Sequence, residues 1–157
     1  MPRSWRIVKA KRAASAFDGE GARLAGGRWN SPGTSMIYTA ESRALATLEV
    51  LVHLNGPELL HEYVLIAVDF PETAVNTLSA SALPGGWRAY PAPAALQKLG
   101  DGWARKADSI VLSVPSVVAE GERNYLLNPA HPSFKAAVRI AKPEHFKFDL
   151  RLLDRSH

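Results

Sequence analysis

The chain has 157 residues, of which 46% are hydrophobic and 22% are charged, and this balance predicts a single globular domain over residues 1–157. It contains no cysteine, which excludes disulfides, cysteine zinc sites and thiol catalysis and predicts a reducing, cytoplasmic setting. The net charge of +4 comes without a basic stripe or a recognition motif, so we expect no direct nucleic-acid binding. No stretch approaches the ~20 apolar residues of a membrane span, and the N-terminus lacks the apolar run of a signal peptide.

The first half of the chain predicts three strands and one well-marked helix. Short β-forming runs indicate strands at Trp5–Val8 and Met36–Thr39. Apolar residues recur with helical spacing from Glu41 to Leu54, and the sequence Asn55-Gly56-Pro57 then supplies a helix stop. Alternation predicts the third strand at Tyr63–Phe70.

The second half predicts a further mixture of helix and strands. Its expected elements are a turn at 84–87, a helix at Ala92–Ala107 with a break at Gly100–Gly102, a buried strand at Ser109–Val114, an extended loop at Asn128–Pro132, and strands at Val138–Ile140 and Phe146–Leu153. Helices and strands mix without a βαβ rhythm. We therefore predict an α+β fold with a mixed or mostly antiparallel sheet and flanking helices.

A glycine- and proline-rich segment, 26–33, surrounds one arginine, Arg28, with Trp29 and Asn30 beside it and Tyr38 shortly after. Glycines allow the backbone to approach a ligand closely, and a guanidinium can bind phosphate or carboxylate through two parallel hydrogen bonds. The segment therefore predicts a site for an anionic, planar ligand. The alternative is a hairpin turn with a solvated arginine.

Glu49 lies at the border of the apolar stripe of the predicted helix, and His53 follows one turn later on the same border. A carboxylate there is partly desolvated and needs a partner, which is typical of a functional group. The alternative is a solvated glutamate with a histidine near the helix C-terminus, where the helix dipole favours a cation.

Ser113 and Ser116 come at the end of the buried strand. A serine past a strand end either caps a turn or donates its hydroxyl to a ligand at the sheet edge. No G-x-S-x-G sequence surrounds Ser116, so a hydrolase nucleophile elbow is not expected.

Several familiar signatures are missing from the sequence. It has no Walker loop and no G-x-G-x-x-G after a strand, which argues against P-loop and Rossmann nucleotide binding. None of the histidines has metal-site spacing, so we predict no metal. These are His53, His61, His131, His145 and His157.

Taken together, several short blocks occur in a characteristic order. They are Trp5-Arg6-Ile7, Gly19-Glu20-Gly21-Ala22, Gly26-Gly27-Arg28-Trp29-Asn30, Tyr38-Thr39-Ala40-Glu41-Ser42, Leu48-Glu49-Val50-Leu51-Val52-His53, Val114-Pro115-Ser116 and Asn128-Pro129-Ala130-His131-Pro132. The ordered set covers nearly the whole chain and resembles the RES domain, the toxin component of Xre–RES toxin–antitoxin systems.

The resemblance implies an ADP-ribosyltransferase-like fold and cleavage of NAD⁺ at the nicotinamide–ribose bond, by phosphorolysis or hydrolysis. Inorganic phosphate is then the expected co-substrate and an Xre-type antitoxin the expected protein partner. The family's Arg, Glu and Ser correspond to Arg28, Glu49 and Ser116, which we predict to be catalytic. The predicted NAD⁺-binding residues are Arg28, Tyr38, Trp29, Asn30, His53 and Asn128.

The residue chemistry agrees with this interpretation. Breaking an N-glycosidic bond passes through an oxocarbenium-like centre, which a buried carboxylate such as Glu49 stabilises. Nicotinamide leaves as a neutral molecule, so no general acid is needed. Two alternatives stay open: transfer of ADP-ribose to a protein acceptor, and a non-enzymatic module that binds nucleotides or nucleic acid.

Overall fold

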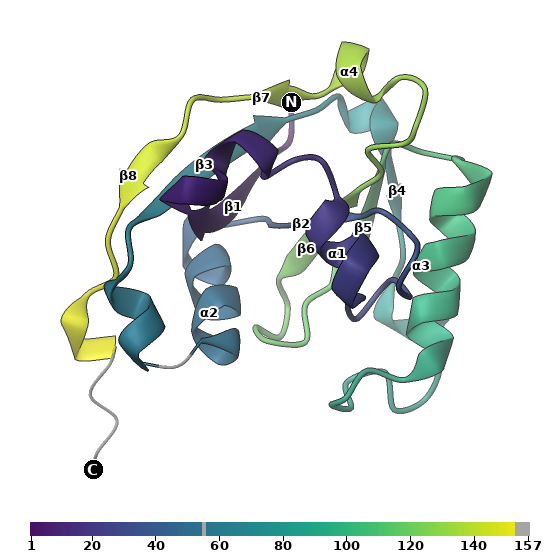
Figure 1. The fold of residues 1–157 in the computed structure, drawn as a ribbon. Coiled ribbons are helices and arrows are strands. Elements are labelled where there is room, and N and C mark those ends of the chain that lie inside the picture. Colours follow the sequence, from purple (N-terminus) through teal and green to yellow (C-terminus); the bar gives the residue numbers. More distant parts are fainter. Residues whose placement is uncertain (55, 153–157) are drawn as a thin grey trace.

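The computed structural model describes residues 1–54 and 56–152. Its helices and strands, in chain order, are β1 Arg3–Lys9, α1 Glu20–Ala25, β2 Ile37–Ala40, α2 Arg43–His53, β3 Tyr63–Asp69, β4 Val75–Thr77, α3 Ala94–Lys106, β5 Val111–Pro115, β6 Arg123–Leu127, α4 Phe134–Ala137, β7 Arg139–Ile140 and β8 Glu144–Phe146 (Figure 1). Short 3₁₀ turns include 10–15, 56–60 and Leu150–Leu152.

One eight-stranded sheet organises the fold. Its strand order is β4-β5-β6-β2-β1-β3-β7, and β8 also pairs with β3. Every pair is antiparallel except β4 with β5, which is parallel. The predicted α+β class with a mixed, mostly antiparallel sheet is therefore confirmed.

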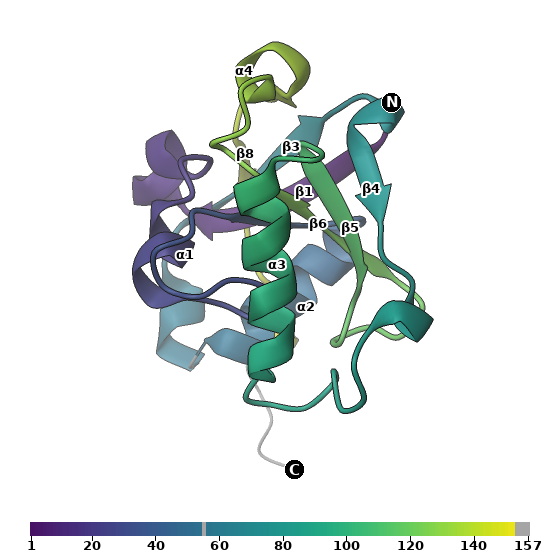
Figure 2. The same cartoon turned by 90° about the vertical axis from the view of Figure 1, so that its right-hand side faces the viewer.

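Helices α2 and α3 both cover one face of this sheet. Residues opposite each other in a register share a face, so Tyr38, Leu126 and Leu112 lie on the same side. Helix α3 packs there through Leu96 and Trp103. Helix α2 packs further along the same face, where Leu45 and Leu51 meet Ile7, Ala40 and Leu65. In Figures 1 and 2 the two helices accordingly stand over different parts of the curled sheet.

The opposite face carries a separate apolar cluster. There Ile37, Val111 and Leu127 of neighbouring strands pack with Phe70 and with Phe134 of α4. The central strands β2, β5 and β6 are therefore buried on both sides, which makes them a rigid base for side chains on the α2–α3 face.

Three expectations about local structure were wrong. Helix α3 runs through Gly100–Gly102 without a break, and Gly100 is explained by the backbone of Trp29, which lies against it and leaves no space for a Cβ atom. Residues 128–132 form turns leading into α4, held by bonds such as His131 N–H to Asn128 O, and are not an extended loop. The last predicted strand is replaced, up to Leu152, by the end of β8 and a 3₁₀ turn, because Phe148 turns inward onto Tyr63; Leu153 lies outside the described residues.

Two strands were not predicted from the sequence, β4 and the central strand β6. Strand β6 reads Arg-Asn-Tyr-Leu-Leu and begins with two polar residues, so it lacks a clear strand pattern. It owes its conformation to pairing on both sides, with β2 and with β5. Asn55, part of the expected helix stop, lies outside the described residues.

Within residues 1–54 and 56–152, no helix is long and apolar enough to cross a membrane. The same residues contain no cluster of three or more His, Asp or Glu side chains able to hold a metal ion.

Candidate functional site

The glycine-rich segment folds into a tight loop around Asn30. The Gly27 N–H donates to the Asn30 carbonyl over 3.0 Å, and Gly26 adopts a φ of 75°, a conformation that favours glycine. The Asn30 side chain is fully buried, and its amide donates to the carbonyls of Ala22 (2.8 Å) and Thr34 (3.0 Å). The loop is therefore held from within.

Helix α3 packs against this loop and forms hydrogen bonds to it. The Gln97 amide donates to the Gly27 carbonyl over 3.0 Å, and Asp101 accepts from the Ser31 N–H over 2.9 Å. Gly100 lies directly against the backbone of Trp29. Gly100 and Asp101 follow Gln97 by three and four positions, so one face of the helix fixes the loop that carries Arg28.

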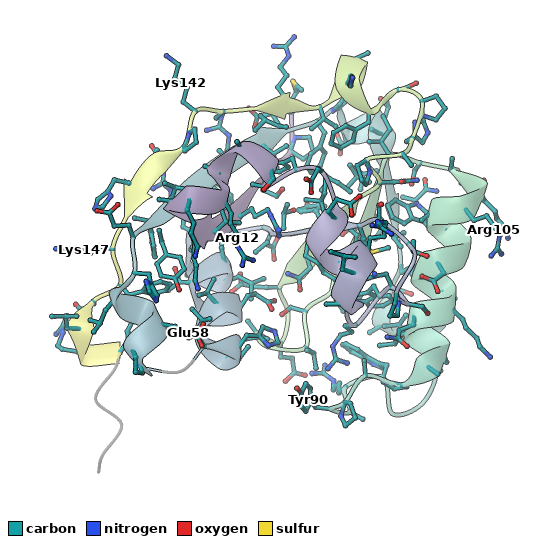
Figure 3. The ribbon with its side chains drawn as sticks, viewed as in Figure 1. Arg12, Glu58, Tyr90, Arg105, Lys142 and Lys147 are labelled. Atoms are coloured by element: carbon teal, nitrogen blue, oxygen red, sulfur yellow. The ribbon has the colours of Figure 1, made fainter. Side chains whose placement is uncertain are left out.

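Arg28 is half-buried and contacts the segment 85–91. Its two terminal nitrogens donate to the carbonyls of Trp87 (2.9 Å) and Ala89 (3.1 Å). These bonds hold the guanidinium in one orientation, and the loop and the turn are 59 residues or more apart in sequence. Tyr90, in the same segment, is 85% exposed, and Figure 3 shows it at the lower edge of the molecule.

Glu49 extends from α2 toward the central strands. The helix begins cleanly because the Ser42 side chain accepts from the Leu45 N–H over 3.0 Å as its N-cap. Glu49 is half-buried, and its carboxylate accepts a 3.1 Å bond from the side-chain amide of Asn124 on β6. The glutamate is therefore not a freely solvated residue.

Arg28 and Glu49 lie within electrostatic range of each other. Burial raises the pKa of Glu49, while the bond from Asn124 and the nearby side chains of His53 and Arg28 act to lower it. Burial lowers the pKa of Arg28, and Glu49 is the largest opposing influence. A half-buried cation and a half-buried anion thus influence each other electrostatically, although they form no direct ion pair within residues 1–54 and 56–152.

Tyr38 is tied into the glycine-rich loop by its hydroxyl. That hydroxyl donates to Asn30 Oδ1 over 2.6 Å and accepts from the Trp29 N–H over 3.0 Å. Burial raises the pKa of Tyr38, so it stays protonated and keeps donating. Since the hydroxyl is engaged, the ring is the part of Tyr38 left to meet a ligand.

Ser116 is buried and caps the turn after β5. Its Oγ accepts from the N–H groups of Val118 (3.1 Å) and Ala119 (3.0 Å). The capping alternative is thus observed. Both bonds use the hydroxyl oxygen as an acceptor, and the predicted catalytic role of Ser116 stays a prediction.

The remaining predicted ligand residues occupy different surroundings. Trp29 is buried against α3, and the side chain of Asn30 is hydrogen-bonded within the glycine-rich loop. Asn128 is buried, donates to the Ala104 carbonyl (2.9 Å) and accepts from the Ala130 N–H (3.0 Å). His53 is exposed at the end of α2, four residues after Glu49. The structure therefore brings together Arg28, Tyr38, Glu49 and His53, and gives Trp29, Asn30 and Asn128 supporting contacts.

Sequence reasoning missed Asn124 and the carbonyls of Trp87 and Ala89. Every residue has a backbone carbonyl, so the sequence could not identify those of Trp87 and Ala89 as the acceptors for Arg28. Asn124 belongs to the unpredicted strand β6. Its register partner, Ala40, is the last residue of β2 and directly follows the predicted strand Met36–Thr39.

Comparison with known proteins places this geometry in a family. The model of the RES domain matches residues 3–149. The chain belongs to the RES domain family. The predicted resemblance is therefore confirmed, while the outer domain boundaries of 1 and 157 stay a prediction.

The curated relatives of this RES domain are toxins by name. "Toxin Res" of Yersinia enterocolitica is 39% identical over 148 residues, covering 94% of this chain and 97% of the relative. The "Prs ADP-ribosylating toxin" of a Sphingobium strain is 38% identical over 154 residues, covering 95% of each chain.

A solved structure shares the fold. The M. tuberculosis MbcT–MbcA toxin–antitoxin complex contains a chain that superposes with a TM-score of 0.77 at 23% identity, covering 92% of this chain and 84% of that one. This RES domain therefore has the same fold as that chain, while the expected likeness to ADP-ribosyltransferases stays a prediction.

Proposed function

We propose that this RES domain is a toxin that cleaves NAD⁺ at the nicotinamide–ribose bond. The observation that carries the proposal is that Arg28 and Glu49 are both half-buried and lie close enough for each to affect the pKa of the other. NAD⁺ carries an anionic pyrophosphate and a cationic nicotinamide group, so its charges complement those of Arg28 and Glu49. The names of relatives sharing 39% and 38% identity support the toxin part of this proposal.

Glu49 supplies the negative charge that the reaction needs. As the bond to nicotinamide breaks, positive charge develops on the ribose C1″ and ring oxygen. A carboxylate held in place by Asn124 stabilises that charge without having to reorient during the step. Water or inorganic phosphate then adds to C1″, giving ADP-ribose or ADP-ribose 1″-phosphate, and nicotinamide departs as a neutral molecule.

Arg28 supplies binding and orientation. Its guanidinium is already aligned by the carbonyls of Trp87 and Ala89, so little freedom is lost when it meets a phosphate. The ring of Tyr38, fixed through Asn30, offers a surface for an aromatic ring of the substrate.

A second candidate is transfer of ADP-ribose to a protein. The name of the Sphingobium relative, an ADP-ribosylating toxin, favours it. Both candidates share the bond that breaks and differ in the acceptor, which is phosphate or water in one case and a protein side chain in the other.

We also propose an antitoxin of the Xre type as the protein partner, working in the cytoplasm. A fold neighbour was solved as a toxin–antitoxin complex, which supports this part of the proposal.

Incubation of the purified protein with NAD⁺ tests the activity. Chromatography should detect nicotinamide, and added phosphate should convert the second product from ADP-ribose to ADP-ribose 1″-phosphate if the reaction is phosphorolysis. ³²P-labelled NAD⁺ with a bacterial lysate would instead label a protein if transfer occurs. Unchanged NAD⁺ in every arm, with folded protein, would rule out all three reactions.

A further inference from the structure

We propose that Asn124 is a positioning residue for Glu49: its side-chain amide holds the glutamate carboxylate against the central sheet. The inference rests on the proposed function, because it assigns Glu49 the reacting role. It adds a residue outside the Arg, Glu and Ser set of the family resemblance.

The geometry of the amide is specific. Asn124 Nδ2 donates to the Thr39 carbonyl over 3.1 Å and to Glu49 Oε1 over 3.1 Å. Both neighbours are acceptors, so the NH₂ group and not the amide oxygen must face them. One bond anchors the amide to strand β2, and the other transmits that fixed position to a side chain of helix α2.

The backbone that carries Asn124 is also fixed. It lies on β6 between Ala40 of β2 and Val114 of β5, in the middle of the sheet. Just before it, the Arg123 N–H donates to the Glu41 carboxylate over 2.7 Å, and the Glu41 N–H donates to the Arg123 carbonyl over 3.1 Å.

The start of α2 is fastened to the same stretch of chain. The Ser42 hydroxyl donates to Glu122 Oε1 over 2.9 Å, while its oxygen caps the helix. The Asn124–Glu49 bond then joins α2 itself to β6 further along the helix.

The bond also has an electrostatic consequence. Burial raises the pKa of Glu49, and the Asn124 bond is the largest influence that opposes it. The other groups that lower this pKa are His53, one turn along α2, and Arg28 from the glycine-rich loop. Removing the amide should leave the carboxylate more easily protonated and less well oriented.

The test compares Asn124→Leu with Ser4→Ala. Leucine keeps the approximate volume of asparagine and removes the donor. Ser4 is buried on β1 and bonds to the Thr39 hydroxyl over 2.7 Å, so its loss weakens the sheet without touching Glu49. The carboxyl pKa of Glu49 is measured by NMR on protein with ¹³C-labelled glutamate, with Glu49→Gln identifying the signal. NAD⁺ turnover is measured against pH on the same preparations.

We expect the pKa of Glu49 to rise in Asn124→Leu and to stay unchanged in Ser4→Ala. In Asn124→Leu, kcat should fall by about 10- to 100-fold with KM within about threefold, and the acid limb of the profile should move to higher pH. If Asn124→Leu does not fold, Asn124→Ser replaces it, because a serine is too short to reach the carboxylate.

A folded Asn124 variant with the wild-type pKa of Glu49 would overturn the proposal, as would equal shifts in Ser4→Ala. The titration needs no substrate. A wild-type protein that leaves NAD⁺ intact would therefore contradict the proposed function, while a raised Glu49 pKa in the variant would still support the positioning contact.

Discussion

A Cβ atom at Gly100 would lie 1.7 Å from the carbonyl oxygen of Trp29, so helix α3 and the glycine-rich loop touch backbone to backbone. This contact places the loop that carries Arg28. It also explains why a glycine, ordinarily unfavourable in a helix interior, sits in the middle of α3.

Gly100→Ala should therefore be strongly destabilising. The methyl group forces the helix and the loop apart, and we expect a loss of about 3 kcal/mol or more in the free energy of unfolding. Gly102→Ala is the matched control, because the nearest atom to its Cβ is the tip of Arg105 at 4.0 Å. It should stabilise the protein by about 0.5–1 kcal/mol. Urea unfolding of both variants measures the difference, and equal effects would disprove the close contact.

Arg28→Lys should lose most of the activity. An ammonium cannot reach the carbonyls of Trp87 and Ala89 and also present a fork to a pyrophosphate. We expect kcat/KM for NAD⁺ to fall by about 30- to 1,000-fold in both Arg28→Ala and Arg28→Lys. Arg105→Lys, on the outer side of α3 in Figure 3, is the control and should match wild type. A fully active Arg28→Lys would remove the bidentate role.

Glu49→Gln should separate function from stability. Glutamine keeps the shape and can still accept from Asn124, so the fold should persist while nicotinamide release drops by about 100-fold or more. Turnover and melting temperature are read on one preparation. A variant with full turnover would place Glu49 outside the reaction.

The same substitution should change how stability depends on pH. Burial raises the pKa of Glu49 above its ordinary value of 4.5, so the folded protein binds this proton more tightly than the unfolded chain does. In the wild type, ionisation of the buried Glu49 carboxyl therefore lowers the free energy of unfolding as pH rises through the raised pKa. Below pH 4.5 the carboxyl is protonated in both states, and this destabilisation is absent. Glu49→Gln should consequently gain stability relative to wild type at neutral pH and lose that advantage at pH 4. A difference that is constant with pH would contradict the direction of the shift.

Tyr38→Phe distinguishes the ring of Tyr38 from its hydroxyl. Phenylalanine leaves Asn30 Oδ1 buried without its donor and the Trp29 N–H without its acceptor. We expect the free energy of unfolding to fall by about 1–3 kcal/mol. If the ring meets the substrate, the folded variant should keep KM within about threefold, whereas Tyr38→Ala should raise it at least tenfold. Matching kinetics in the two variants would exclude a contact through the ring.

The sequence by itself determined the helix α2, the strands β1, β2, β3 and β5, and the α+β class. The local sequence is enough to predict these elements, because apolar residues repeat with the period of the helix or strand that buries them. Arg28 and Glu49 were also legible from sequence. The arginine stands among glycines, and the glutamate sits at the edge of an apolar stripe, where a charge has a desolvation cost.

Tertiary structure decided what local pattern could not. Strand β6 has no strand pattern and exists because β2 and β5 pair with it on either side. The glycines of α3 look like a helix break until Trp29 is placed against Gly100. The partners of the two site residues, Asn124 for Glu49 and the carbonyls of Trp87 and Ala89 for Arg28, lie 59 to 75 residues away in sequence. Such contacts depend on where the sheet brings distant backbone together, and no periodicity within a single segment records that.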